Sequence, residues 1–463
     1  MNKQDNFYKY TSFRNKYKFF SYEKYSYYIS DSCFHIKYEF NLNDTFYFKP
    51  TINIPQKEIF NLQSVTENVS ANFLNNIIFN IGMVELLSYW KTTCSPKIII
   101  KPHFLTPEQI SFWKKLYYNG LGEFLYLNSI QTDEEQFCEI YANSGSKLFP
   151  ESINTINDTL IPIGGGKDSV VTLELLSSLK TNNLPLILNP RGATLSTISS
   201  AGYSINNIFE IQRTIHPQLL KLNEDGFLNG HTPFSALLAF ISILAAVISG
   251  KKNIALSNES SANESTIVNT NINHQYSKTY EFERDFRIYV KNYISDSFNY
   301  FSFLRPLNEL QIAKLFSGFP KYFPVFKSCN AGSKTDIWCG VCSKCLFTYI
   351  ILSPFITSKL LMEIFGKNLL DDINLRFYFD QLIGIENTKP FDCIGTPDEI
   401  NTALVMTIRK TENHLPRLLE YYKTLLIYKK FENTDDQILL HNYNKNHFLT
   451  EQFENILIQR INA

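Results

Sequence analysis

The sequence predicts an α/β protein whose core is a doubly wound parallel β-sheet. Beyond residue 159, strand-like apolar segments alternate with helical segments. Three consecutive glycines at 164–166 connect the first of these strands to the next helix. A long segment at 233–249 is almost entirely apolar and is followed at once by another strand-like run. Strands that alternate with helices form parallel sheets covered on both faces, and such sheets bind ligands at the carboxyl ends of their strands.

Residues 1–150 are predicted to form a mixed α+β N-terminal domain. Strand-like alternation around a polar turn indicates a hairpin, and apolar residues at helical spacing indicate two helices. We find no catalytic motif in this part of the sequence. The expected elements are a hairpin at 34–54 with its turn at Asn41–Asp44, a helix at about 68–92, a strand at Lys97–Lys101, a helix at Pro107–Tyr118 and a strand at Glu123–Leu127.

The rest of the chain is predicted to divide into a central domain, 151–350, and a mainly helical C-terminal region, 351–463. The doubly wound sheet belongs to the central domain. Its expected strands are 159–164, Leu184–Leu188, Ile208–Gln212 and 253–257, and its expected helices are 169–180, 233–249 and 278–293.

The apolar segment 233–249 has two interpretations, a buried crossover helix and a membrane span. Its length is near the lower limit for crossing a bilayer. Pro233 and Gly250 are the start and stop signals of a helix in a globular protein, which favours the buried crossover helix. The first twenty residues also lack the apolar core of a signal peptide. We therefore expect a soluble, cytoplasmic protein that does not bind a membrane.

The charge balance argues against one class of partner. The chain has 44 Lys+Arg and 44 Asp+Glu, so its formal net charge is zero. Proteins that bind nucleic acid along an extended surface carry a basic excess. We therefore expect no nucleic-acid partner.

The glycine-rich turn after the first central strand indicates a phosphate-binding loop. Glycines bring bare N–H groups close to an anion, and the positive end of the following helix points at the same place. An ordinary strand–helix turn is the alternative. A Walker loop ends in Gly-Lys-Ser/Thr, whereas here Lys167 is followed by Asp168. The candidate residues are Gly164, Gly165, Gly166, Lys167, Asp168 and Ser169.

Three side chains of this loop have expected roles in binding a nucleotide. Lys167 would hold the outer phosphates, Asp168 would bind Mg²⁺, and Ser169 would contact a phosphate at the start of the helix. A plain helix cap is the alternative for Asp168.

Four of the eight cysteines form a compact Cys-x9-Cys-x2-Cys-x2-Cys motif. Four thiolates at these spacings suit a closed tetrahedral Zn²⁺ site, which would be structural because protein fills every ligand position. An iron–sulfur cluster and unliganded buried cysteines are the alternatives. The four residues are Cys329, Cys339, Cys342 and Cys345, whereas Cys33, Cys94, Cys138 and Cys393 are scattered and are assigned no chemistry.

Several acidic residues and histidines lie in polar runs rather than on apolar faces. Glu259 and Glu264 lie in a Ser/Asn-rich loop after a strand and could bind a metal or act as a base; a solvated loop is the alternative. His231 and His274 are flanked by Gly, Asn and Gln, which favours a functional role over a core histidine.

Three cationic residues are candidates for binding anionic groups. Lys278 could neutralise a phosphate or carboxylate, or could be an ordinary surface lysine. Arg191 and Arg305 each lie beside a proline at a strand end and could bind a carboxylate or diphosphate with two hydrogen bonds. A structural ion pair is the alternative for both arginines.

Two resemblances follow from these motifs. The loop at 164–169 resembles the pyrophosphate loop, Ser-Gly-Gly-x-Asp-Ser, of enzymes that cleave ATP between its α- and β-phosphates, except that Gly164 replaces the first serine. A longer ordered series resembles the UDP-N-acetylmuramoyl-L-alanyl-L-glutamate epimerases of bacterial cell-wall synthesis. Its segments are Pro-Ile-Gly-Gly-Gly-Lys-Asp-Ser (162–169), Asn-Pro-Arg (189–191), Leu-Asn-Gly-His-Thr-Pro (228–233), 257–264, 273–283, 304–310, the cysteine motif and Lys-Pro-Phe-Asp-Cys-Ile-Gly (389–395).

The resemblance implies an isomerase that converts the terminal L-glutamate of the UDP-muramoyl dipeptide to D-glutamate, consuming ATP to AMP and diphosphate with Mg²⁺. It would act after a ligase that adds L-glutamate in peptidoglycan precursor synthesis. Residues 151–350 would be an ATP-binding domain of the pyrophosphate-loop type that ends in the cysteine motif with its structural Zn²⁺. The implied cofactor-binding residues are Gly164, Gly165, Gly166, Lys167, Asp168, Ser169, Arg191 and Glu264, and the catalytic candidates are His231, His274, Glu259 and Lys278. The acid/base pair stays open among the two histidines and Glu259.

Other functions of a pyrophosphate-loop protein are also open. One is a ligase of the 7-cyano-7-deazaguanine synthase type, which would end with ammonia instead of water. Another is a tRNA-modifying adenylating enzyme, against which the neutral net charge counts. A nucleotide-binding regulator is a third, although the retention of Lys167, Asp168 and Ser169 favours an enzyme.

Overall fold

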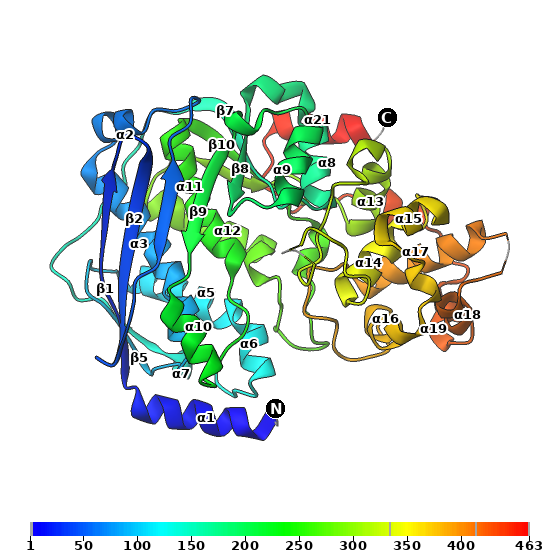
Figure 1. Ribbon diagram of the computed structural model, residues 1–463, viewed down its shortest axis with the longest axis horizontal. Helices are drawn as coiled ribbons and strands as arrows, with labels where there is room; N and C mark the ends of the chain where they lie inside the picture. Colours follow the sequence, from blue (N-terminus) through cyan, green and yellow to red (C-terminus); the bar gives the residue numbers. More distant parts are fainter. Residues whose placement is uncertain (1–2, 333–334, 413, 462–463) are drawn as a thin grey trace.

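The computed structural model describes residues 3–332, 335–412 and 414–461 and confirms the expected α/β class. Its centre is an eleven-stranded mixed sheet in the order β11-β10-β7-β8-β9-β4-β2-β1-β5-β6, with β3 paired to β2. Figure 1 shows this sheet on the left and a cluster of helices on the right. The strands are β1 Phe19–Ile29, β2 Cys33–Leu42, β3 Phe46–Phe48, β4 Thr51–Pro55, β5 Lys97–Ile100, β6 Glu139–Tyr141, β7 Ile156–Pro162, β8 Asn183–Leu188, β9 Phe209–Thr214, β10 Lys251–Leu256 and β11 Asn299–Ser302.

Strands β7 to β11 form a parallel section that is covered on both faces. The pairings that these five strands make with one another are all parallel. Adjacent residues of one strand enter different hydrophobic cores, as Leu160 and Ile161 do in β7. Helices α8 (Lys167–Leu175) and α9 (Gly192–Ser200) contribute to one core, and α11 (Phe234–Ser249) and α12 (Tyr280–Tyr293) contribute to the other. The chain reverses its direction of winding between β7 and β10, so the loops that follow these two strands meet at a ligand-binding position.

The N-terminal strands extend this same sheet. The predicted hairpin at 34–54 is confirmed as β2, β3 and β4, which pair antiparallel. Strand β4 then pairs antiparallel with β9, with Thr51 opposite Thr214. The sheet therefore crosses residue 150, and the domain division at residues 150 and 350 stays a prediction.

One predicted element is wrong. Residues Glu123–Leu127, expected as a strand, lie in helix α6 (Gly122–Leu127), which directly follows α5 (Pro107–Gly120). The backbone N–H of Leu125 donates to the carbonyl of Leu121 at 2.9 Å, and Phe124 and Leu125 are buried. A short apolar run fits a strand or a buried helix equally well, so its tertiary environment decides between them.

The expected helix at about 68–92 corresponds to the end of one helix and two further helices, the first of which begins after Ser70. The Ser70 hydroxyl accepts a hydrogen bond from the N–H of Phe73 at 3.0 Å, which is an N-cap. The three helices are α2 Leu62–Asn68, α3 Ala71–Glu85 and α4 Leu87–Trp90. Elements that were not expected from the sequence include α1 Lys3–Lys16, β1, β6, α7 Glu134–Phe137, α9, α10 Pro217–Glu224 and β11.

The C-terminal region, 351–463, is mainly helical, as expected, and it packs together with two helices that precede it, α13 and α14, against one face of the parallel section. Helix α13 contacts α8 and α14, and α14 contacts α17. These helices form the cluster on the right of Figure 1. They are α13 Glu309–Ser317, α14 Ser343–Leu352, α15 Ser358–Phe365, α16 Arg376–Leu382, α17 Pro397–Lys410, α18 Arg417–Lys423, α19 Leu426–Phe431, α20 Gln437–Leu440 and α21 Glu451–Ile461.

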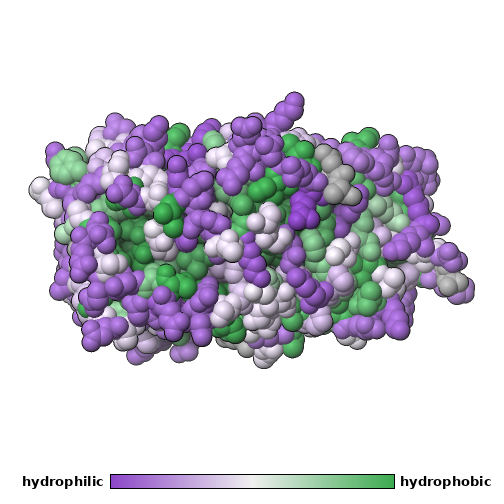
Figure 2. Space-filling model, turned by 90° about the horizontal axis from the view of Figure 1, so that it is seen from above, coloured by the Kyte–Doolittle hydropathy of each residue, from purple (hydrophilic) through white to green (hydrophobic). Residues whose placement is uncertain are grey.

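Helix α11 is the buried crossover helix that the sequence favoured. It connects β9 to β10 and packs against α3 and β10. Within the part of the chain that the structure describes, no helix has both the length and the apolar character needed to cross a membrane. Figure 2 shows polar residues interspersed with smaller apolar patches on the face seen from above.

The packing of α3 on the N-terminal strands depends on Gly82. A Cβ atom at this position would lie 2.5 Å from Tyr22 Cζ and 2.8 Å from Tyr38 Cε1. Both rings are fully buried, so neither can move aside freely. We expect Gly82→Ala to lower the free energy of unfolding by about 1–3 kcal/mol through overpacking.

Urea unfolding followed by fluorescence measures this loss of stability. The control is Gly145→Ala, where an added Cβ meets nothing within 4 Å. The control should change the free energy of unfolding by less than about 0.5 kcal/mol. Equal effects of the two substitutions would contradict the packing argument.

Candidate active site

The glycine loop lies between the end of β7 and the start of α8, with little room around two of its glycines. Gly165 has φ +83°, a left-handed conformation that favours glycine, and a Cβ there would lie 3.1 Å from the backbone nitrogen of Thr194. At Gly166 a Cβ would lie 3.2 Å from Ser328 Cβ. At Gly164 it would meet nothing within 4 Å, so this position has open space beside it.

The start of α8 is arranged by the loop itself. Gly166 is the N-cap residue and supplies no side chain to the first N–H groups of the helix. Ser169 Oγ donates to the carbonyl of Gly166 at 2.9 Å and accepts from the N–H of Gly165 at 3.2 Å. The positive end of a nine-residue helix therefore faces the loop without a capping side chain.

The ammonium group of Lys167 lies between two carboxylates. Lys167 Nζ forms ion pairs with Asp168 and with Glu309, the first residue of α13. Burial by itself would lower the pKa of Lys167, but the two carboxylates outweigh it and raise that pKa above its usual value. Glu309 was not a candidate from the sequence, although it lies in the segment 304–310 that carried the family resemblance.

A third carboxylate joins this pair from the loop after β10. Asp168, Glu259 and Glu309 each have one carboxylate oxygen in this cluster, and these three oxygens lie within 4.8 Å of one another. Burial and the neighbouring carboxylates raise the pKa of Glu309 to about 8 and raise that of Glu259. Burial also raises the pKa of Asp168, but Lys167 and Lys344 outweigh it and lower that pKa. Oxygen ligands crowded in this way suit Mg²⁺, so the three side chains are candidate Mg²⁺ ligands.

The two histidines predicted to be functional lie together and share one carboxylate. His274 Nδ1 is 2.5 Å from Glu123 Oε2, and His231 Nδ1 is 3.7 Å from the same oxygen. Burial, reinforced by His274 and Lys91, lowers the pKa of His231 to about 3. Burial would also lower the pKa of His274, but hydrogen bonds to Cys393 and Glu123 raise it to about 9. Glu123 could be found only from the structure, because its segment was predicted as a strand.

These three residues fit a hydrogen-bonded cluster better than a metal site. Two ligands of one tetrahedral zinc ion lie about 3.4 Å apart, given bonds of about 2.1 Å. The 2.5 Å between His274 Nδ1 and Glu123 Oε2 is instead the length of a short charge-assisted hydrogen bond.

Lys278 lies beside a cysteine to which the sequence assigned no chemistry. Lys278 Nζ donates to Cys393 Sγ at 3.1 Å. Burial would lower the pKa of Lys278, but Cys393 and Glu259 outweigh it and raise that pKa. The structure therefore brings Lys278, His274 and Glu259 into one neighbourhood, and it adds Cys393 to them.

The two arginine candidates differ in position. Arg305 is completely buried and joins three segments: it donates to the carbonyl of Glu259 at 2.6 Å, to the carbonyl of Lys278 and to Glu283 Oε2 at 3.0 Å. This is the structural role that the sequence left as an alternative. Arg191 is exposed and is the N-cap residue of α9, whose first turn contacts Gly165.

Glu264 does not join the carboxylate cluster. Its carboxylate pairs with Lys389 Nζ at 2.6 Å, and its side chain is 41% exposed. Together with Lys389 and Lys430 it lines a separate cavity of about 270 Å³. Its assignment as a cofactor-binding residue stays a prediction.

The four cysteines of the motif converge on one point. The Sγ–Sγ distances are 3.7 Å for Cys329–Cys342, 3.7 Å for Cys339–Cys345 and 3.5 Å for Cys342–Cys345. Thiolates on a single tetrahedral ion with Zn–S bonds of about 2.3 Å would lie about 3.8 Å apart. The donor set and its spacing therefore fit one zinc-sized ion.

The cysteine motif is joined to the candidate active site through α14. Ser343 Oγ donates to Asp392 Oδ2 at 2.5 Å, and Lys344 Nζ donates to the carbonyl of Cys393. Ser343 and Lys344 are the two residues between Cys342 and Cys345 in the sequence. The motif thus positions the loop that carries Cys393.

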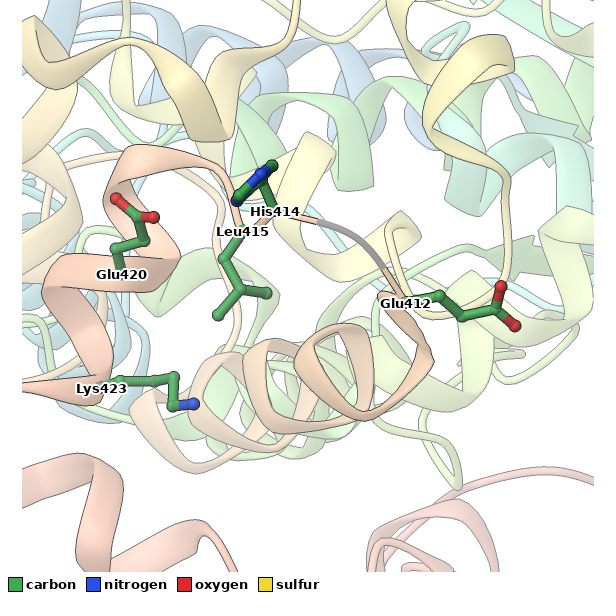
Figure 3. A pocket seen from close by; sticks show the side chains of 5 residues that line it. All are labelled: Glu412, His414, Leu415, Glu420 and Lys423. Atoms are coloured by element: carbon green, nitrogen blue, oxygen red, sulfur yellow. The ribbon is translucent and has the colours of Figure 1, made fainter.

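A larger cavity lies in the C-terminal region. It has a volume of about 740 Å³ and is lined by Glu412, His414, Leu415, Glu420 and Lys423. Figure 3 shows Glu420 and Lys423 on a helix and His414 and Leu415 on the segment leading to it. None of these five residues belongs to the carboxylate or histidine clusters.

Comparisons with known proteins agree with one another. The model of the MurL N-terminal domain matches residues 11–303, and that of the MurL C-terminal domain matches residues 325–433. No solved structure matches the chain.

Three curated relatives carry one name, UDP-N-acetyl-alpha-D-muramoyl-L-alanyl-L-glutamate epimerase. The protein of Xanthomonas oryzae pv. oryzae is 33% identical over 340 residues, which is 72% of this chain and 74% of the relative. Those of a Micromonospora species and Salinispora tropica are each 32% identical, over 72% of this chain and 74% and 73% of the relatives. The two domain matches and these identities show that the chain belongs to the MurL family.

Proposed function

We propose that this protein is an isomerase that converts the terminal L-glutamate of UDP-N-acetylmuramoyl-L-alanyl-L-glutamate to D-glutamate in peptidoglycan precursor synthesis. The relatives' shared name states this reaction for them. The observation that carries the proposal to this chain is the match to both MurL domains. The site at the carboxyl ends of β7 and β10 is where such a fold binds its ligands.

We also propose that the reaction begins with transfer of AMP from ATP to the glutamate carboxylate. The α-hydrogen beside an ionised carboxylate is hard to remove, whereas acylation of AMP removes that charge and turns the carbonyl into an electron sink. The uncapped start of α8 and Lys167 would hold the departing diphosphate. Asp168, Glu259 and Glu309 would bind Mg²⁺, which neutralises developing charge on the phosphates. These features favour a pyrophosphate-loop fold.

The amide on the substrate glutamate offers a route to an acidic α-hydrogen. Attack of the alanyl amide oxygen on the activated carboxyl would expel AMP and close an oxazolone ring, whose α-anion is delocalised. Direct enolisation of the adenylate is the rival route. Water would release the free acid in either case. A reaction that adds L-glutamate to a UDP-muramoyl-alanine must supply this substrate.

The cysteine motif is proposed to hold a structural Zn²⁺. Its Sγ–Sγ distances fit one tetrahedral ion, and all four ligand positions are filled by thiolates. The ion would stabilise α14 and, through Ser343 and Lys344, the loop that carries Cys393.

The proposed reaction is tested directly with ATP, Mg²⁺ and the UDP-muramoyl dipeptide. Chiral analysis should find D-glutamate, and dipeptide labelled with ¹⁸O in its terminal α-carboxylate should give labelled AMP. Free L-glutamate should not be epimerised, because it cannot close the oxazolone ring. Unlabelled AMP would show that water attacks ATP, which contradicts adenylation; epimerisation of free L-glutamate would contradict the oxazolone route alone.

The carboxylate cluster should control adenylation rather than folding. We expect Asp168→Asn and Glu309→Gln each to slow dipeptide-dependent AMP formation by about 10²–10³-fold, because each removes stabilisation of charge in the transition state. Asp158→Asn is the control, because Asp158 lies on β7 away from the loop and pairs with Lys251 of β10. Thermal melting checks that the variants fold, and near-normal turnover in both active-site variants would show that the cluster is only structural.

Purified protein should contain about one zinc ion per chain. We expect Cys342→Ser to lose the ion and to lower the melting temperature, because a structural zinc site contributes folding free energy directly. Cys33→Ser, outside the motif on β2, should retain the metal. Elemental analysis and thermal melting measure the two effects, and metal-free protein of undiminished stability would overturn the assignment.

A further inference from the structure

Cys393 lies at the end of a chain of hydrogen-bonded side chains. His274 hydrogen-bonds to Cys393, and its Nδ1 is 2.5 Å from Glu123 Oε2. An ionised carboxylate can only accept, so Nδ1–H donates to Glu123 and the imidazole is held in one orientation. A thiol, an imidazole and a carboxylate linked in this order form the arrangement that activates cysteine side chains in enzymes. The Cys393 side chain is half-buried, so part of it is open to a substrate or a reagent.

Three cations act on the Cys393 thiol. Burial raises its pKa, but Lys278, the hydrogen bond from His274 and Lys344 outweigh burial and lower that pKa to about 5. By contrast, burial raises the pKa of each of the other cysteines outside the zinc motif, Cys33, Cys94 and Cys138. At neutral pH Cys393 is therefore a thiolate.

The thiolate lies near Glu259 of the carboxylate cluster, because its charge is one of those that raise the pKa of Glu259. Lys278, which donates to Cys393 Sγ, is also attracted by Glu259 and Asp168. Arg305 binds the backbone carbonyls of Lys278 and Glu259 together. A substrate carboxylate placed for reaction with ATP at the loop would therefore bring its α-carbon close to Cys393.

The other candidates for the base are less suitable. His274 already donates to Glu123 and hydrogen-bonds to Cys393. His231 has a pKa of about 3, so it holds a proton poorly. Glu259 belongs to the carboxylate cluster that would bind Mg²⁺.

We propose that the Cys393 thiolate is the base that removes the α-proton of the activated L-glutamyl residue, with His274 and Lys278 as positioning residues. This inference rests on the proposed function. The C–H bond breaks, its electron pair delocalises into the activated carbonyl, and an S–H bond forms. A donor on the opposite face forms the new C–H bond, and the thiol then returns its proton to solvent. A thiolate of this modest basicity requires a strongly acidified α-hydrogen, which activation of the carboxylate supplies.

The test separates adenylation from proton transfer. Exchange of labelled diphosphate into ATP, dependent on the dipeptide, reports adenylation alone, whereas deuterium incorporation at the glutamate α-carbon in D₂O reports proton removal. For Cys393→Ala and Cys393→Ser we expect diphosphate exchange within about threefold of normal and deuterium incorporation reduced by at least about 10²-fold. Cys33→Ser, which changes a half-buried cysteine on β2, should leave both rates unchanged.

Each other outcome has a defined meaning. Normal deuterium incorporation in Cys393→Ala would overturn the role as base. Loss of both diphosphate exchange and deuterium incorporation in this variant would overturn it as well. Labelled dipeptide covalently attached to acid-quenched wild-type protein would also overturn it, because it would make Cys393 a nucleophile. Absence of diphosphate exchange in the wild-type protein would instead contradict the proposed function.

Alkylation of the zinc-loaded wild-type protein tests the same residue without any substitution. Iodoacetamide at pH 6 should modify Cys393 at least about tenfold faster than Cys33, and the dipeptide with ATP should protect it. In His274→Gln and Lys278→Met, the midpoint of the alkylation pH profile should rise toward about 8.5, the value of a free thiol. An unshifted profile, or no protection by substrates, would overturn the inference.

Discussion

The burial of three carboxylates around one ammonium group is the constraint on which the site depends. Asp168, Glu259 and Glu309 lie together from three separate segments, and Lys167 pairs with two of them. Like charges this close and this buried would repel one another strongly without cations. Lys167, and beyond it Lys278 and Lys344, balance the cluster, and the same charges form the site at which we propose that Mg²⁺ and a phosphate group bind.

Two buried charged side chains hold the backbone of this site in place. Arg305 joins the loop after β10 to the turn before α12 through hydrogen bonds to Glu259 and Lys278. Glu399 in α17 accepts hydrogen bonds from the N–H of Glu309 at 2.7 Å and from Ser261 Oγ at 2.6 Å. Neither group needs to touch a substrate. Each forms hydrogen bonds with backbone groups that would otherwise be unpaired in the interior. These bonds hold the segments that carry the carboxylates in fixed positions relative to one another.

Local motifs could be predicted because their residues are adjacent in sequence. The glycine loop, its Lys167-Asp168-Ser169 ending and the four clustered cysteines each place their functional groups within a few residues, and the structure brings each set together as expected. Glu309, Cys393 and Glu123 could not be predicted in the same way. Each belongs to no motif of like residues at a recognisable spacing, and a lone cysteine or glutamate has no pattern that distinguishes it from a structural one.

The sequence by itself determined the α/β class, the crossover helix α11, the glycine loop and the cysteine motif, because these follow from hydrophobic periodicity and from short-range spacing. Only the tertiary structure decided that residues 122–127 are helical, that the N-terminal strands extend the central sheet through β4 and β9, and that Cys393 contacts Lys278. These outcomes depend on contacts between residues more than a hundred positions apart. Such contacts arise from packing and charge pairing in the folded chain, and no local pattern records them.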